Sequence, residues 1–376
     1  MAENKEKKVL NVPNLRFPEF EGEWKKCKLG DACNVFMCKR ILATQTNTEG
    51  GVPFYKIRTI GGTPDAYISK ELFDDYKTKY NYPHKGEVMI TCAGTVGKCV
   101  IYDGKDAYYQ DSNIVWIDNP SQYIGNGFLY HLLANVDWRK LNSTTIIRIY
   151  NDDLRNLKLS YPQIEEQKKI SRLLSLLDDR ISTQNKIIEK LESLIKGIRN
   201  DVFGKLRKSV GFNAMIGDVL SYEQPQSYLV EDTEYTNEGT PVLTANKAFV
   251  LGYTSEIEGI YDKGDCIIFD DFTLDCKYVD FSFKVKSSAI KILTAKNKEL
   301  LRYTFEFLKY LDLSTEEHKR HYITETQNQE FILPTVQIIR TIAHAFYALS
   351  LWKETIVKQR YAFEKQKQYL LRQMFI

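Results

Sequence analysis

Apolar residues recur every three or four positions through the middle of the chain, over residues 164–203. A period of 3.5 residues predicts a helix that buries one narrow stripe against another helix. At about 1.5 Å per residue, about forty residues would form a rod of roughly 60 Å, which predicts a spacer or scaffold. A polar residue within such a stripe can fix the register of helix pairing, and Gln184 is a candidate for that role. The stripe comprises Ile170, Leu174, Leu177, Ile181, Gln184, Ile188, Leu191, Ile195, Ile198 and Val202.

The segment before this helix has the pattern of short strands separated by turn residues. Pro13 and Pro18 disfavour regular structure in residues 1–23. The elements expected after them are strands at 52–60, 87–92, 100–102, 114–117 and 157–161, a helix at 127–136, and a short helix at 151–154.

The second half of the chain repeats this order. Pro162 and Phe203 return as Pro334 and Phe375, both 172 positions later. Several such matches in one order indicate a tandem duplication of a globular domain followed by a long helix. The other matching segments are 28–31 with 215–218, 51–53 with 239–241, 85–90 with 263–268, 112–114 with 288–290, and 128–136 with 300–311.

A second long helix is predicted at 336–375, but long cations interrupt its apolar stripe. Lys353, Arg360 and Lys367 stand at seven-residue steps between apolar positions. Such side chains can lay their methylenes along a helix seam with the charge outside, and we favour this interpretation. The alternative is that this edge faces nucleic acid or an acidic partner. The apolar positions are Ile342, Phe346, Leu349, Ile356, Phe363 and Leu370.

Composition narrows the class of protein. The 376 residues carry a net charge of only +3, so a DNA-binding surface would have to be a local patch. The 24 Tyr and 19 Phe are compatible with base stacking, but we favour tyrosine-rich β domains as their explanation. The seven cysteines form no Cys-x-x-Cys pair, so we expect reduced thiols and no zinc site. The sequence has neither a signal-peptide pattern nor a membrane-spanning apolar run, so a soluble, cytoplasmic protein is expected.

One glycine-rich segment, Ala-Gly-Thr-Val-Gly-Lys at 93–98, resembles a phosphate-binding loop. A P-loop requires an earlier Gly and a Ser or Thr after the Lys, but these positions hold Cys92 and Cys99. A tight turn between strands is therefore the favoured interpretation. A turn that carries Thr95 and Lys98 can still contact a DNA phosphate.

The other catalytic patterns are incomplete. Residues 64–65 (Pro-Asp) and 75–77 (Asp-Tyr-Lys) resemble a nuclease pattern, which is unspecific in a chain with 49 acidic and 52 basic residues. Residues 119–123 (Asn-Pro-Ser-Gln-Tyr) differ from the Asn/Asp-Pro-Pro-aromatic loop of adenine methyltransferases, and no glycine-rich Rossmann turn is present. Five scattered histidines complete no catalytic triad. We expect a binding protein with no catalytic residue, no cofactor and no metal.

Polar and basic segments recur at matching places in the two halves. Arg, Lys, Asn and Thr are side chains that contact base edges and phosphates. A solvated loop explains each segment alone, but recurrence with different residues would suit two domains that recognise different sequences. The candidate DNA-binding residues are Lys56, Arg58, Thr59, Thr95, Lys98, Thr144, Arg148, Thr244, Asn246, Lys247, His318, Lys319 and Arg320.

Two parts of the sequence carry a family resemblance. The first comprises residues 15–20 (Leu-Arg-Phe-Pro-Glu-Phe), Trp24 and 28–31 (Lys-Leu-Gly-Asp). The second comprises residues 151–154 (Asn-Asp-Asp-Leu) and 159–170, which include Pro-Gln-Ile-Glu-Glu-Gln. The first resembles the opening, and the second the domain-closing segment and helix entry, of the DNA-sequence specificity subunits of type I restriction–modification systems. The resemblance covers the whole chain with its duplication, although the second closing segment lacks the Glu-Glu-Gln.

The resemblance implies an α/β (α+β) fold with two mixed target-recognition domains held apart by an antiparallel coiled coil of two long helices. The expected parts are a first recognition domain at 1–162, a central helix at 163–205, a second recognition domain at 206–334 and a C-terminal helix at 335–376. Each domain would recognise one half of a bipartite asymmetric DNA site. Two methyltransferase subunits would dock on the helices and methylate adenine, and separate restriction/translocase subunits would cleave.

Two other functions are compatible with the sequence. A coiled-coil adaptor that binds proteins but not DNA is the main alternative. An enzyme built on the 94–98 loop is the third possibility, and it would require nucleotide binding that depends on Lys98.

Overall fold

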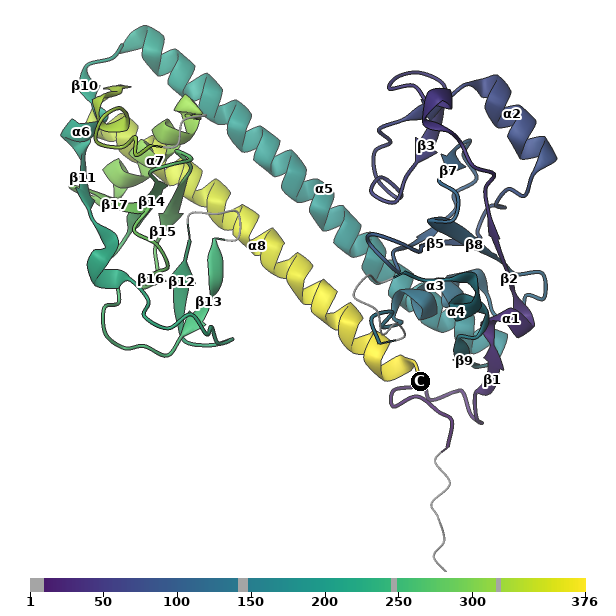
Figure 1. The fold of residues 1–376 in the computed structure, drawn as a ribbon. Helices are drawn as coiled ribbons and strands as arrows, with labels where there is room; N and C mark the ends of the chain where they lie inside the picture. Colours follow the sequence, from purple (N-terminus) through teal and green to yellow (C-terminus); the bar gives the residue numbers. More distant parts are fainter. Residues whose placement is uncertain (1–9, 141–147, 245–248, 316–318) are drawn as a thin grey trace, which may run out of the picture. The chain divides into compact units, whose positions relative to one another are not determined.

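The computed structural model describes residues 10–140, 148–244, 249–315 and 319–376, which belong to two compact units (Figure 1). Unit 1 comprises Met1–Thr183 with Arg360–Ile376, and unit 2 comprises Gln184–Gln359. Each unit has its own β-sheets and its own hydrophobic clusters. The fold is therefore of the expected mixed α/β type with two sheet-containing parts.

Unit 1 is built on a four-stranded antiparallel sheet of order β2-β8-β5-β6. A three-stranded sheet of order β4-β3-β7 and a two-stranded sheet β1-β9 complete it. Its strands are β1 (Lys25–Lys28), β2 (Asn34–Met37), β3 (Val52–Tyr55), β4 (Tyr67–Ile68), β5 (Val88–Thr91), β6 (Cys99–Ile101), β7 (Tyr108–Tyr109), β8 (Ile114–Asp118) and β9 (Lys158–Tyr161). Its shorter helices are α1 (Leu29–Ala32), η1 (Ala43–Gln45), α2 (Lys70–Lys79), α3 (Asn126–Ala134) and α4 (Asn151–Arg155).

Unit 2 repeats this topology strand for strand. The four-stranded sheet has order β11-β17-β14-β15, the three-stranded sheet β13-β12-β16, and the two-stranded sheet β10-β18. Its strands are β10 (Ala214–Met215), β11 (Leu220–Glu223), β12 (Thr240–Leu243), β13 (Val250–Thr254), β14 (Cys266–Asp270), β15 (Cys276–Val279), β16 (Lys284–Val285), β17 (Ile290–Ala295) and β18 (Glu330–Phe331). Its shorter helices are α6 (Ile216–Val219), η2 (Pro225–Tyr228), α7 (Lys298–Leu311) and η3 (Thr326–Asn328).

The repeated Gly-Asp pair has one structural role in both units. A Cβ on Gly30 would lie 3.0 Å from the Arg155 carbonyl oxygen, and one on Gly217 would lie 3.1 Å from the Gln327 carbonyl oxygen. Glycine thus allows the short helix α1 to approach α4 and α6 to approach η3. The Asp that follows each Gly accepts a hydrogen bond from the backbone N–H three residues before it, at 2.8 Å in both units.

Most predicted element positions in unit 1 are confirmed, but the strand predicted at 52–60 is too long. Strand β3 ends at Tyr55, and the next residues form a turn in which Ile60 N donates to the Lys56 carbonyl at 3.0 Å. The helix predicted at 164–203 is α5 (Ile164–Ser209), and the second long helix is α8 (Val336–Met374).

The two long helices pack antiparallel within unit 1. Lys367 of α8 donates to Asp178 of α5 at 2.5 Å, and the Arg180 guanidinium lies 5.5 Å from the Phe363 ring centroid. Asp178 contacts Lys367, whereas Arg180, which is later on α5, contacts Phe363, which is earlier on α8. The two helices therefore run in opposite directions. A cation that interrupts the stripe of α8 is thus paired across the helix seam.

The same arrangement occurs within unit 2. Glu192 of α5 pairs with Lys353 of α8 at 2.6 Å, so this interrupting cation also contacts the partner helix. The polar position Gln184 donates its amide N–H to the Gln359 amide oxygen at 3.4 Å. A polar contact inside an apolar stripe is what a register-setting role for Gln184 requires.

The motifs that carried the family resemblance meet in unit 1. Arg16 binds Glu166 with both ends of its guanidinium, at 2.8 and 2.7 Å, and the Glu166 side chain is buried. The neighbouring Gln167 donates to the Tyr123 carbonyl and accepts from Gly125 N, at 2.9 and 2.8 Å. The Glu-Glu-Gln segment therefore anchors the start of α5 to the N-terminal segment and to the loop before α3.

Candidate nucleic-acid interface

The first candidate segment is the turn that follows β3. Thr59 accepts a hydrogen bond from Lys56 N at 3.0 Å, so its hydroxyl closes the turn. Lys56 pairs with Asp65 at 3.2 Å, and both side chains are largely exposed. Arg58 is exposed, and its guanidinium has no ion pair among the described residues. Of these residues, Arg58 is the most available for a ligand.

The second segment, residues 92–98, is a tight loop between the antiparallel strands β5 and β6. Lys98 N donates to the Thr91 hydroxyl at 3.0 Å, and that hydroxyl donates to the Thr95 carbonyl. A phosphate-binding loop would join a strand to a helix, so the preferred interpretation as a strand-to-strand turn is confirmed. The Lys98 ammonium donates to the Ile60 carbonyl, which ties this loop to the turn after β3.

The third segment, residues 148–150, lies beside the same loop. Ile149 N donates to the Cys92 carbonyl at 2.9 Å, and Arg148 stands over the Tyr150 ring at 5.8 Å. Burial raises the pKa of the Cys92 thiol to about 12, and the nearby Arg148 charge only partly opposes that shift. Three segments far apart in sequence thus meet at the carboxyl end of β5. Thr144 lies outside the described residues.

Unit 2 assembles the corresponding segments in the same way. Asp271 follows β14 as Cys92 follows β5, and it donates its N–H to the Ala289 carbonyl at 3.0 Å. His321 N donates to the Asp271 carbonyl at 3.1 Å, the counterpart of the bond between Ile149 and Cys92. The end of β14 therefore gathers the 271–275 loop and the 319–322 segment.

The candidate residues of unit 2 differ in accessibility. Arg320 is exposed, and Lys319 pairs with Glu325 at 2.9 Å. Thr244 is only 6% exposed, which does not suit a direct contact with DNA. Asn246, Lys247 and His318 lie outside the described residues.

A buried ion pair supports this end of unit 2, and nothing in the sequence pattern indicated it. Lys291 is 1% exposed, and its ammonium lies 3.6 Å from the Asp271 carboxylate. The same carboxylate accepts hydrogen bonds from His321 N and Tyr322 N, at 3.0 and 2.7 Å. The strand register shows that Val115 of β8 occupies the position in unit 1 that Lys291 of β17 occupies in unit 2. At this position unit 2 thus has a buried charge where unit 1 has an apolar side chain.

The described residues contain no cluster of three or more His, Cys, Asp or Glu side chains arranged to hold a metal ion. Among the described helices, none has the length and apolar character to cross a membrane. The acidic residues of the nuclease-like pattern form ion pairs, Asp65 with Lys56 and Asp75 with Lys79.

Comparison with known sequences bears on the first half of the chain. Residues 21–193 match the family model described as the type I restriction modification DNA specificity domain. Residues 21–193 are thus similar to this domain family. The matched range includes the interface segments of unit 1 and the first part of α5.

Two relatives support this assignment. A putative type I restriction enzyme specificity subunit, S.HindORF215P, from Haemophilus influenzae is 46% identical over 189 residues, covering 50% of this chain and 46% of the relative. The EcoR124I/EcoR124II specificity subunit from Escherichia coli is 45% identical over 126 residues, covering 32% of this chain and 31% of the relative. The matched part thus spans less than half the length of either relative.

The fold extends the similarity to the whole chain. The crystal structure of a type I restriction–modification S subunit from M. genitalium matches with a TM-score of 0.68. The match covers 97% of this chain and 99% of that chain, at 16% sequence identity. At this identity the match shows a common fold, which includes the second unit.

Proposed function

We propose that the protein is a sequence-specific DNA-binding specificity subunit of a type I restriction–modification complex. Each unit would recognise one half of a bipartite asymmetric site. The observation that carries the proposal is the recurrence of loop segments at the same end of the same four-stranded sheet in both units, with different side chains. One backbone frame with two sets of side chains suits two different half-sites.

In unit 1, Arg58 and Arg148 are the proposed base-contacting residues. Arginine forms bidentate hydrogen bonds with guanine in the major groove, and Arg58 is exposed at the turn after β3. Thr95 and Lys98 would contact phosphates, because both are exposed on the 92–98 loop and Lys98 carries a positive charge. Lys56, Thr59 and Thr144 complete the proposed interface as supporting residues.

In unit 2, Arg320 is the proposed base-contacting residue. Lys319 would contact a phosphate in exchange for its present pairing with Glu325. Asn246, Lys247 and His318 extend this interface from the sequence pattern. Thr244, which is buried, would have a supporting role and no direct contact with DNA.

The long helices are proposed to space the recognition domains and to bind methyltransferase subunits. The proposed recognition domains are 1–162 and 206–334, and the proposed helical parts are 163–205 and 335–376. Large apolar side chains on the helix segments of unit 2 are more than a third exposed, as a protein-docking surface requires. They include Ile187, Leu194, Leu351 and Trp352.

The protein would have no catalytic role of its own. Methylation would belong to the docked methyltransferase subunits, and cleavage to separate restriction/translocase subunits in the cytoplasm. Long-read sequencing of methylated bases in cells with and without the chain tests this function. Loss of one discontinuous methylated motif on deletion is the expected result, and an unchanged methylation pattern would contradict the proposal.

The exposed apolar residues of the helices also favour a second candidate function, a protein-binding adaptor without DNA specificity. Duplex binding separates the two functions, because phosphate contacts weaken steeply with salt. A specificity subunit should bind a duplex with its recognition site in a salt-dependent manner. An adaptor should bind partner subunits equally well but show no preference between duplexes.

A further inference from the structure

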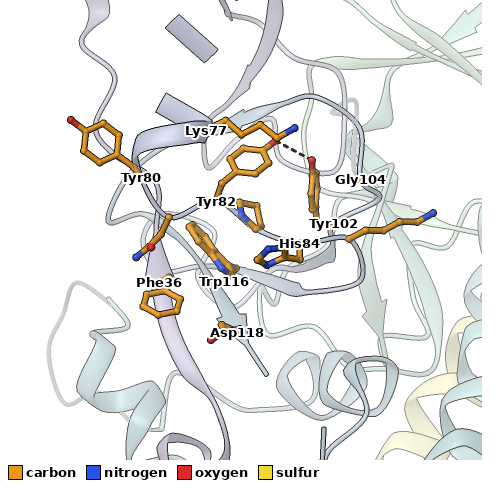
Figure 2. A pocket seen from close by; sticks show the side chains of 12 residues that line it. Phe36, Lys77, Tyr80, Tyr82, His84, Tyr102, Gly104, Trp116 and Asp118 are labelled. Carbon is orange, nitrogen blue, oxygen red and sulfur yellow. Dashed lines mark hydrogen bonds between the residues drawn. The ribbon is translucent and has the colours of Figure 1, made fainter. Parts of the chain in front are cut away.

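Unit 1 contains a cavity of 560 Å3 at the opposite end of its four-stranded sheet from the candidate interface (Figure 2). Strand β8 begins at Ile114 beside the interface loops and ends at Asp118, which lines the cavity. Strand β5 likewise ends at Thr91 beside the 92–98 loop and begins at Val88, close to the cavity residues His84 and Lys85. The cavity is thus separate from the segments proposed to bind DNA.

Aromatic side chains form the walls of this cavity. Figure 2 shows the Tyr82 and Tyr102 hydroxyls joined by a hydrogen bond, which is 2.9 Å long. Tyr82 also donates to the Ala107 carbonyl at 2.6 Å, so these rings are held in place without a ligand. A preformed cavity of a few hundred Å3 with rigid rings is typical of small-molecule sites. The aromatic lining residues are Phe36, Tyr80, Tyr82, Tyr102 and Trp116.

The lysines around the cavity favour an anionic ligand. Lys77 and Lys85 line it, and Asp118 is its one lining carboxylate. The His84 imidazole also lines it, with Nδ1 3.5 Å from the Glu87 carboxylate. Asp118 accepts a hydrogen bond from the side chain of Asn34 at 2.9 Å. Aromatic cages can bind quaternary ammonium ligands, but the positive charges of these lysines would repel such a ligand.

Lys85 is the cation best placed for a ligand. Its side-chain carbons pack against Gly104, where an added Cβ would lie 3.1 Å from Lys85 Cδ. The described residues provide no carboxylate partner for its ammonium, whereas Lys77 pairs with Asp106 at 3.1 Å. The Lys85 charge is therefore held at the cavity edge and available.

The helix that precedes the cavity segment is present in unit 1 but not in the described part of unit 2. Helix α2 and the segment after it, which supplies residues 80–85, lie between β4 and β5. The corresponding strands of unit 2, β13 and β14, are joined by residues 255–265 without a described helix. The repeated fold therefore does not require α2 and residues 80–85, so these residues can serve a function specific to unit 1, such as ligand binding.

We propose that this cavity binds a nucleotide, with the base against the aromatic walls and the phosphate at Lys85 and His84. A planar base suits the rings, and an anionic phosphate suits the cations. The nucleotide comes either from a free mononucleotide or from an unpaired residue of a nucleic-acid strand, since 560 Å3 is too small for a duplex.

Isothermal titration of the full chain with AMP, adenosine and inorganic phosphate tests the proposal. AMP should bind one site per chain, at least tenfold more tightly than adenosine or phosphate, because both halves of the ligand are needed. Titration with a short single-stranded oligonucleotide distinguishes the two sources of the nucleotide. Equal affinity of AMP and phosphate would overturn the proposal.

Two variants locate the site. Lys85→Ala should weaken AMP about tenfold and leave adenosine unchanged, whereas Tyr80→Ala should weaken both by about tenfold. The control Lys105→Ala, an exposed lysine that pairs with Asp103, should change neither. Unchanged AMP affinity in Lys85→Ala would contradict the site. Duplex binding by Lys85→Ala should equal that of the wild type, so competition between AMP and duplex would contradict a separate site.

Discussion

The two units have the same strand order, yet different chemistry joins the sheets and short helices of each unit to the long helices. In unit 1, the fully buried His131 of α3 lies 3.4 Å from Ser175 and 4.0 Å from Asp178, both on α5. Burial lowers the pKa of His131 to about 4, so the imidazole is neutral near pH 7. The contact between α3 and α5 in unit 1 thus depends on the His131 imidazole, which is neutral near pH 7 and becomes charged at low pH.

In unit 2, the same junction is a network of permanent charges. Arg199 of α5 donates twice to Glu306 of α7, at 3.0 and 2.7 Å, and Arg302 lies 3.4 Å from the same carboxyl group. Arg302 also donates to the Phe346 carbonyl and the Ser350 hydroxyl of α8. Duplicated folds can thus keep one backbone arrangement while the polar groups that fix it change completely.

The largest expected effect is on the charged junction. Glu306→Leu would leave two buried guanidinium groups without their carboxylate, which should cost about 3–5 kcal/mol of unfolding free energy. Urea unfolding, followed by hydrogen exchange of α7, measures the loss. Glu354→Leu is the matched control, because Glu354 pairs with Lys358 on the surface and should lose little. A loss under about 1 kcal/mol would mean that packing, not charge, holds the unit 2 junction.

The second prediction is a pH dependence that is larger in unit 1 than in unit 2. The unfolded chain protonates His131 near pH 6.5, whereas the folded chain does so only near pH 4. Above about pH 6.5 the imidazole is neutral in both states, so its titration does not lower the unfolding free energy. As the pH falls from about 6.5 to about 4, the unfolded chain binds a proton that the folded chain does not, and the unfolding free energy falls by about 3 kcal/mol in all. Urea unfolding of unit 1 between pH 7 and 4 measures it.

A variant isolates the contribution of the imidazole. His131→Gln should be less stable at pH 7 but should lose less stability than the wild type between pH 6.5 and 4. Hydrogen exchange of α7 reports unit 2 in the same samples and should change less over this range. Equal pH slopes for wild type and variant would show that other groups cause the dependence.

Sequence patterns located the elements well because apolar periodicity and turn residues are local signals. The duplication, α5 and the strands around Val88–Thr91 were all predictable in this way. The contact between Arg16 and Glu166 was not, since it joins residues 150 positions apart. Both segments stood out in the sequence, but only the fold brings them together.

The segments of the candidate site could be found in the sequence, but the structural roles of their side chains could not. The segments around Arg58, Lys98 and Arg148 do meet at the end of β5, because each follows or precedes a strand of the repeated frame. Residue type could not reveal that the Thr59 hydroxyl closes a turn or that Thr244 is buried. Those roles depend on local hydrogen bonds that sequence periodicity does not encode.

The third prediction separates the units by the DNA half-site that each recognises. Arg58→Ala should relax specificity at one half-site, and Arg320→Ala at the other, each by about 1–3 kcal/mol of discrimination. Methylated-base sequencing of cells that express each variant measures this directly. Lys105→Ala is the control and should leave both half-sites unchanged. An equal loss at both half-sites would show that these arginines bind phosphate or support folding.

The smallest expected effect concerns the helix seam, where the two units resemble each other. Lys353→Met and Lys367→Met each remove an ion pair with α5, to Glu192 and Asp178 respectively. Glu192 is 52% exposed and Asp178 33% exposed, so solvent screens both pairs and each should contribute only about 0.2–1 kcal/mol. Methionine keeps the long apolar stem along the seam, so packing should persist.

Urea unfolding at low and high salt is the measurement: salt should remove the difference between wild type and variant. Lys367→Met should have the larger effect, because Asp178 is the more buried acid and also faces His131. The reverse order would mean that the seam charges act independently of the junction that distinguishes the two units.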